Sequence, residues 1–168
     1  KVGNRRYVHS TALGKVMLAD MQEKDVIRLL RMKGMPRMTP NTITAEAALL
    51  RHLRLVREQG FAIDNQEHEP DGRCIGVAIR DARDDRAIGG LSISGPIHRM
   101  TRSHAKSLLE PLSKACEQVA ARIAALIASM VMRDRPLRTT SGPQAAAAQV
   151  PGGADREGSG ETGRRPVG

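Results

Sequence analysis

The sequence predicts an α+β domain in which helices pack on an antiparallel sheet. Apolar residues recur at helical spacing before residue 60 and again after residue 103. Between these regions, short apolar or alternating runs are separated by turn-forming residues, as in neighbouring strands. This order of helices, strands and a final helix is typical of the α+β class. The 168 residues, 40% of them hydrophobic, fit one domain of ordinary size with an appendage.

Three helices are predicted before the strands. Residues 14–21 and 25–32 carry apolar side chains every three or four positions, which predicts two short helices. Residues 45–59 place apolar side chains mostly on one face and charged ones on the other, as in an amphipathic helix. Thr44 is the predicted N-cap of that helix, and Gly60 its end.

The second half of the domain is predicted to contain three strands and one long helix. The strands are expected at residues 61–64, 74–79 and 87–94, as antiparallel neighbours joined by turn-rich segments. Residues 103–132 repeat an apolar side chain every three or four positions, which predicts one continuous helix with Pro111 near its first turns.

A change in composition divides the chain near residue 132. Residues 1–132 carry the periodic patterns, whereas residues 133–168 are rich in Pro, Gly and Ala and hold almost no large apolar residues. Such a tail cannot bury enough surface to offset its ordering entropy, so we expect it to be disordered. Residues 1–9 are polar, and the chain starts at Lys1 without a secretory signal, which suggests a fragment.

Composition excludes several classes of function. Aromatic residues amount to 1%, which counts against modules that stack bases on aromatic side chains. The net charge of +9 is spread along the chain and fits a solvated surface as well as contact with a polyanion. Cys74 and Cys116 are too far apart in sequence for a cysteine zinc site, and no pair of His residues has metal-ligand spacing. No stretch reads as a membrane span, and a reducing, cytoplasmic setting is expected.

A Ser/Thr-rich turn before the first predicted helix is one candidate binding element. Ser10 and Thr11 lead through Gly14 into that helix. The first N–H groups of a helix lack intrahelical partners and suit a small carboxylate, although ordinary N-capping explains the same residues equally well. A phosphate loop is excluded, because His9 and Val16 stand where that motif needs Gly and Ser or Thr.

The predicted strands carry further polar candidates. Asp64 and Cys74 lie at facing ends of two strands, where they suit an oxygen-rich ligand, or serve only as a turn residue and a small core residue. Asp64 with Glu67 also has the composition of an acid–base pair, but no activated nucleophile accompanies it. Ser92 and Ser94 are two apart on one strand and therefore face the same side of the sheet.

Read together, these segments resemble the effector-binding domain of the IclR family of bacterial transcriptional regulators. The resemblance covers roughly residues 3–127, in matching order and spacing. It is carried by residues 9–15 (HSTALGK), 39–44 (TPNTIT), 57–64 (REQGFAID), 73–76 (RCIG) and 91–96 (LSISGP). Arg80, the length of the turn at residues 81–86 and Gln66 depart from the family pattern.

The resemblance implies a GAF-like fold that binds a small metabolite, a carboxylate or keto acid, without cofactor or metal. It implies that seven residues form the effector site: Ala12, Leu13 and Gly14 through their backbone, and Asp64, Cys74, Ser92 and Ser94 through their side chains. It also implies a homodimer or homotetramer. Family members carry an N-terminal winged helix-turn-helix domain, followed by the first strands of the effector domain. In this sequence these segments do not stand before Lys1. We therefore expect a truncated effector domain that reaches DNA only through that N-terminal domain.

The function expected from the sequence is ligand sensing and oligomerisation for a DNA-binding regulator, with no catalysis. One alternative is a dimerisation module that needs no ligand and associates through the last predicted helix. A small hydrolase that uses Cys74 as its nucleophile is the enzymatic alternative.

Overall fold

A computed structural model describes residues 6–133, all of which lie within one compact unit of the chain, Lys1–Arg135. Its elements are α1 (Ala12–Asp20), α2 (Glu23–Lys33), α3 (Glu46–Gln59), β1 (Phe61–Asn65), β2 (Gly72–Arg80), β3 (Ala87–Pro96), α4 (Arg102–Ser107) and α5 (Leu109–Arg133). This order confirms the predicted α+β class. The predicted disordered tail, apart from Arg133 at the end of α5, lies outside the described residues.

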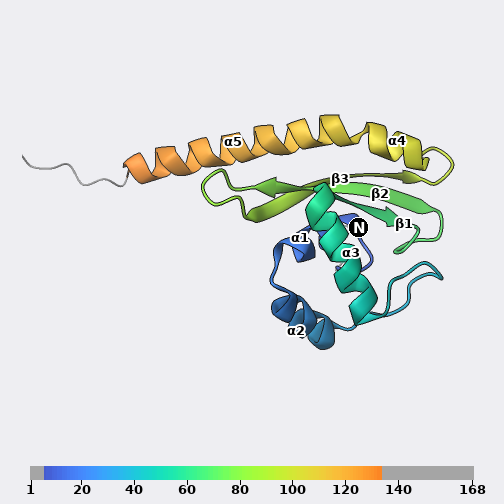
Figure 1. The fold of residues 1–168 in the computed structure, drawn as a ribbon. Coiled ribbons are helices and arrows are strands. Elements are labelled where there is room, and N and C mark those ends of the chain that lie inside the picture. Colours follow the sequence, from blue (N-terminus) through green and yellow to red (C-terminus); the bar gives the residue numbers. More distant parts are fainter. Residues whose placement is uncertain (1–5, 134–168) are drawn as a thin grey trace, which may run out of the picture. The chain divides into compact units, whose positions relative to one another are not determined.

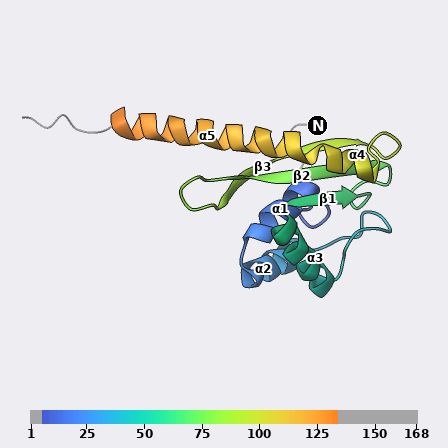
Figure 2. The ribbon, with the colours of Figure 1, turned by 45° about the horizontal axis from the view of Figure 1, so that its top comes forward.

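The sheet has the strand order β1-β2-β3 with antiparallel pairing throughout, so β2 lies in the middle. Figures 1 and 2 show α1, α2 and α3 on one face of the sheet and α4 and α5 along the other. Alternate residues of a strand point to opposite faces, so each strand contributes to both layers. The predicted strands 61–64, 74–79 and 87–94 each fall within an observed strand.

Each face of the sheet has its own hydrophobic core. The core under α1–α3 consists of Val16, Leu18, Ala19, Val26, Leu30, Leu49, Leu53, Val56, Ala62 and Ala78. The core under α5 consists of Ile75, Val77, Ile79, Leu112 and Cys116. The two cores alternate along β2, because Ala78 faces α1–α3 whereas its neighbours Val77 and Ile79 face α5.

Two glycines allow α1 to lie close to its surroundings. A Cβ atom on Gly14 would stand 2.1 Å from the carbonyl oxygen of Val8, so only glycine fits there without displacement of the backbone. A Cβ atom on Gly76 would lie 3.3 Å from the backbone nitrogen of Leu13. The missing side chain in β2 therefore lets the first turn of α1 rest directly on the sheet.

The structure corrects two predicted helix features. Thr44 is not the N-cap of α3: that position belongs to Ala45, which makes no side-chain cap bond, while Thr44 Oγ1 accepts a hydrogen bond from Arg37. The helix predicted at 103–132 is two helices, separated at Leu108. Pro111 is the physical reason, since it has no N–H for the carbonyl four residues earlier and its ring clashes with that carbonyl.

The second half of α5 is apolar and exposed. Leu126, Met130 and Val131 are each more than 60% exposed, at 63%, 67% and 67%. By length and composition alone, Arg102–Met132 is able to span a membrane, with a mean hydropathy of 1.4 in its most apolar window. This contradicts the expectation that no stretch passes that test, although core helices of soluble proteins pass it as well. The first half of α5 is such a helix, since Leu112 and Cys116 are buried against β2.

Gly14→Ala tests the close contact between α1 and the preceding segment. The new Cβ atom has no space beside Val8, so we expect a loss of about 1–3 kcal/mol in the free energy of unfolding, or more. Gly89→Ala is the matched control, because a Cβ atom there meets only a side-chain carbon of Ile79 at 3.8 Å. Chemical denaturation measures both, and equal stabilities of the two variants would contradict the assignment.

His52 of α3 gives a pH-dependent prediction. Burial and, to a lesser extent, the positive charge of Lys15 lower the pKa of His52 from 6.5 to about 4. Between these values the unfolded chain binds more protons at this residue than the folded chain, so stability falls as the pH falls.

We expect acidification from pH 7 to pH 5 to cost the wild-type chain about 2 kcal/mol more than the His52→Gln variant. Urea denaturation at each pH measures the difference. Other titrating groups, such as the buried His9, are shared by both proteins and cancel in the comparison. Parallel pH profiles would show that His52 does not favour the neutral form in the folded state.

Candidate functional site

A cavity of about 1010 Å³ lies between the start of α1, the sheet and the β1–β2 turn. Six of the seven predicted site residues line it: Ala12, Leu13, Asp64, Cys74, Ser92 and Ser94. Gly14 does not, because its nitrogen donates to Thr11 Oγ1 at 3.1 Å and its α-carbon packs against Val8. The structure thus brings together residues that lie up to 82 positions apart, from Ala12 to Ser94.

Strand register places three of the cavity side chains in one row. Asp64 is paired with Cys74, and Cys74 with Ser94, across the three strands. Cys74 Sγ and Ser94 Oγ are 2.9 Å apart and share a hydrogen bond. Ser92 lies in the next row on the same face, opposite Gly76. The prediction that the two serines share a face is therefore confirmed.

The first turn of α1 contributes free backbone donors. Thr11 is the N-cap and accepts from Gly14 N. Within the described part of the chain, the N–H groups of Ala12 and Leu13 have no acceptor, and both residues line the cavity. These donors lie at the positive end of the helix dipole, an arrangement that binds anions.

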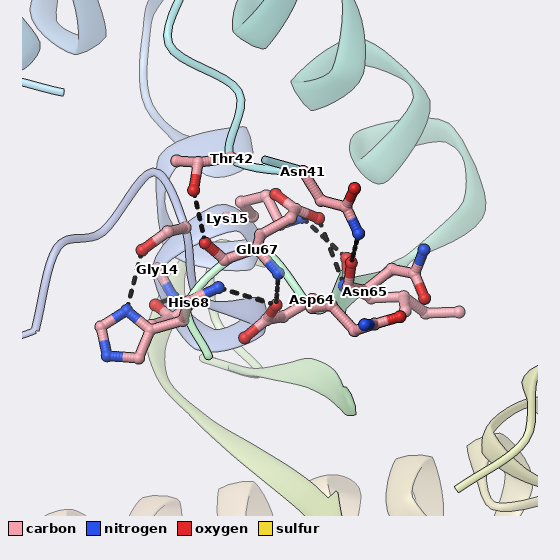
Figure 3. Close-up of polar contacts among 12 residues, drawn as sticks. Gly14, Lys15, Asn41, Thr42, Asp64, Asn65, Glu67 and His68 are labelled. Atoms are coloured by element: carbon pink, nitrogen blue, oxygen red, sulfur yellow. Dashed lines mark hydrogen bonds and ion pairs between the residues drawn. The ribbon is translucent and has the colours of Figure 1, made fainter. Parts of the chain in front are cut away.

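Asp64 has two functions in the structure. Its Oδ1 accepts hydrogen bonds from the backbone nitrogens of Glu67 at 2.8 Å and His68 at 3.3 Å, which holds the β1–β2 turn. Figure 3 shows the second oxygen pointing away from these amides. The side chain is buried, and burial raises the pKa of the Asp64 carboxyl above its ordinary value, against the effect of the two amides and of Lys15.

The surroundings of Cys74 favour its thiol over the thiolate. Burial raises the pKa of the Cys74 thiol, although the hydrogen bond with Ser94 opposes the shift. A thiol with a raised pKa holds little thiolate near neutral pH, whereas catalytic cysteines need a lowered pKa. The geometry therefore supports a polar wall of a binding cavity rather than the hydrolase alternative.

A buried ion pair next to the cavity was not predicted from the sequence. Lys15 of α1 is completely buried, and its Nζ donates to Glu67 Oε1 at 2.5 Å and to the carbonyl oxygen of Ile63 at 2.7 Å (Figure 3). Burial raises the pKa of Glu67, while the ammonium of Lys15 acts in the opposite direction. Glu67 is thus a structural partner of Lys15 and does not line the cavity, which removes the basis for an acid–base pair with Asp64.

The β1–β2 turn adds further cavity residues that the sequence did not single out. His68, Glu69 and Asp71 line the cavity, as does Arg6, which forms an ion pair of 2.8 Å with Glu69. His68 Nδ1 lies 3.0 Å from Ser10 Oγ, and this hydrogen bond ties the turn to the segment before α1. A turn rich in charged residues was visible in the sequence, but its proximity to residues 6–11 was not.

The three departures from the family pattern do not line the cavity, although Gln66 Nε2 donates to the carbonyl oxygen of Pro70, which does. Among residues 6–133, no group of three or more His, Cys, Asp or Glu side chains is placed to hold a metal ion. Arg80 lies away from the cavity and donates to Asp20 at the end of α1 at 2.8 Å.

Comparison with solved structures places this fold among domains of transcriptional regulators. The C-terminal domain of the Escherichia coli transcriptional regulator KdgR is 39% identical, with a TM-score of 0.66 over 71% of this chain and 72% of that one. A double mutant of the inducer-binding domain of the Acinetobacter transcription factor PobR, in complex with 3-hydroxybenzoic acid, is 27% identical with a TM-score of 0.67, over 71% of this chain and 69% of that one.

Sequence comparison agrees with the structural neighbours. KdgR of Escherichia coli is 38% identical over 73% of this chain, and the regulator BhcR of Paracoccus denitrificans is 34% identical over 70% of it. The chain spans less than half of these relatives, 46% and 42% respectively. The model of the bacterial transcriptional regulator IclR C-terminal domain matches residues 1–121. The chain therefore belongs to the IclR family of bacterial transcriptional regulators, and these residues correspond to its C-terminal domain.

Proposed function

We propose that this domain senses a small organic acid, a carboxylate or keto acid, on behalf of a DNA-binding regulator. One observation carries the proposal: the acceptor-free N–H groups of Ala12 and Leu13 open onto the same cavity as Asp64 and the hydrogen-bonded pair of Cys74 and Ser94. Paired N–H groups at a helix N-terminus bind the carboxylate, and the polar row on the sheet contacts the rest of the ligand.

Known relatives support this chemistry. A double mutant of the PobR inducer-binding domain, which has the same fold, forms a complex with 3-hydroxybenzoic acid, and that compound combines a carboxylate with a hydroxyl group. The cavity of this chain offers groups for both: backbone donors for a carboxylate, and a carboxyl and two hydroxyls for a polar substituent. No catalytic step is needed, and the raised pKa of Cys74 disfavours one that uses this thiol.

The effect of ligand binding is transmitted to the rest of the molecule through α1 and the segment before it. A ligand that contacts both α1 and the β1–β2 turn favours one spacing between them. The hydrogen bond between Ser10 and His68 joins the same two parts outside the cavity. A ligand shifts an equilibrium only by its difference in affinity for the two states, so the position of the segment before α1 relative to the turn must differ between them, while the Lys15–Glu67 pair holds α1 itself. The regulator contacts DNA through another domain. We place the regulator in the cytoplasm.

Oligomerisation is the second candidate function, and the exposed end of α5 favours it. Leu126 and Met130 are four residues apart on the helix and therefore adjoin on one exposed side. A groove of about 450 Å³, lined by Ile88, Ile123 and Ile127 among others, lies between α5 and the β2–β3 turn. A second copy of the chain would cover this apolar surface, forming a homodimer or part of a homotetramer.

Asp64→Ala tests the ligand-sensing proposal. Thermal denaturation of the 168-residue chain is measured against glyoxylate, pyruvate and related keto acids, and against the corresponding hydroxy acids, whose hydroxyl group can donate to Asp64. Ligands that bind the folded state raise the melting temperature with concentration, and we expect the variant to lose this rise. Asp64→Asn keeps an acceptor for the turn amides and separates ligand binding from stability. With one charge-assisted contact removed, it should weaken binding at least about tenfold.

The control for this experiment is Asp25→Ala in α2, which changes an exposed carboxylate outside the cavity. It should respond to ligand as the wild-type chain does. Ligand affinity that is the same in the Asp64 variants and the wild type would refute the assignment of Asp64.

Leu126→Arg together with Met130→Arg tests the oligomer proposal. We expect the mass of the wild-type chain in light scattering to rise with concentration, and the double variant to stay monomeric, because buried arginines would lack partners at the interface. Gln118→Arg, at an exposed polar position earlier in α5, adds positive charge outside the apolar surface and should associate like the wild type. A wild-type mass that is monomeric at every concentration would contradict the proposal.

A further inference from the structure

The polar groups of the cavity change in character along the strand direction. The start of α1 lies over Gly76, where a Cβ atom would be 3.3 Å from Leu13 N. The row of Asp64, Cys74 and Ser94 lies two residues closer to the β1–β2 turn, which is about 7 Å along a strand. The cavity therefore has a donor end at α1, a mixed row in the middle and the turn at its far end.

The middle row and the turn end together are rich in acceptors. Three carboxylates line the cavity, those of Asp64, Glu69 and Asp71, and none lies at the start of α1. Among the described residues, Asp64 and Asp71 have no ion-pair partner, whereas Glu69 is paired with Arg6.

The cationic side chains of the cavity are already engaged. Arg6 donates to Glu69 Oε1 at 2.8 Å. Arg73 donates to Asn65 Oδ1 and to the carbonyl oxygen of Met100, and these bonds hold its guanidinium at the base of the segment after β3. The charge of Arg6 is balanced by Glu69, so a second negative group of a ligand would compete with Glu69 for this arginine.

From this gradient, and resting on the proposed function, we propose that the ligand is a monocarboxylic acid whose far end carries hydrogen-bond donors, namely hydroxyl or amino groups. Its carboxylate binds the N–H groups of Ala12 and Leu13. Its donors face Asp64 and Asp71, which supply acceptor oxygens and negative charge. A second carboxylate at that end would meet like charge, which opposes binding.

The competing arrangement is a dicarboxylate whose second group takes Arg6 away from Glu69. The two arrangements predict opposite preferences at the far end of the ligand. A series of acids with equal chain length separates them: hexanoate, 6-hydroxyhexanoate, 6-aminohexanoate and adipate, which differ only in a terminal methyl, hydroxyl, ammonium or carboxylate. The corresponding three-carbon series covers a shorter span: propionate, 3-hydroxypropionate, β-alanine and malonate.

Isothermal titration calorimetry of the 168-residue chain with both series gives the dissociation constants. In the series that fits the cavity, we expect the hydroxy and amino acids to bind at least tenfold more tightly than the diacid, with the plain acid between them. The Asp71→Asn variant should reduce the preference for the amino acid over the diacid at least fivefold. Asp25→Asn, outside the cavity, should leave that ratio unchanged.

The outcomes distinguish this inference from the function on which it rests. Tightest binding by a diacid, weakened by Arg6→Gln, would overturn the inference in favour of the dicarboxylate. Equal binding of all members of a series would overturn the inference while preserving the acid sensor. A cooperative melt with no binding by any acid of either series would overturn both the sensor and the inference.

Discussion

The buried ion pair between Lys15 and Glu67 is the contact on which the site depends. It crosses 52 positions of sequence and joins α1 to the β1–β2 turn, while the same ammonium binds a carbonyl oxygen of β1. Removal of one partner from a buried pair leaves an uncompensated charge, which typically costs about 3–5 kcal/mol. This contact therefore fixes the start of α1, and with it the two free N–H groups, relative to the sheet.

The turn that Glu67 anchors is itself built around Asp64. One oxygen of this carboxyl holds two backbone amides of the turn, and the residue also lines the cavity. The carboxyl group of Asp64 therefore belongs both to the cavity wall and to the turn that supports the cavity. A ligand that contacts Asp64 acts directly on the turn, so binding and local backbone order are linked without any intermediate element.

Sequence periodicity was sufficient for most of the fold because α2 and α3 are amphipathic, with buried residues three or four positions apart. The helix α1 and the strand β2 are buried on most sides, so their apolar runs had to be recognised without a clean alternation. The separation of α4 from α5 followed from Pro111 but was not inferred, since apolar spacing continues through the break. The cavity residues Asp64, Cys74 and Ser94 were predictable from strand alternation and family resemblance. Arg6, His68 and Lys15 were not, because their partners are brought to them by a turn whose path has no periodic signal.

The hydrogen bond between Ser10 and His68 also bears on where the protons of the His68 ring lie. The Ser10 hydroxyl carries one proton but has two neighbours, the carbonyl oxygen of Tyr7 at 3.2 Å and His68 Nδ1 at 3.0 Å. When the hydroxyl donates to the carbonyl, Nδ1 must be the donor to Ser10, and Nε2 of the neutral ring is then an acceptor. In that arrangement a serine outside the cavity sets the tautomer of a histidine in the cavity wall, through a proton shared with the backbone of Tyr7.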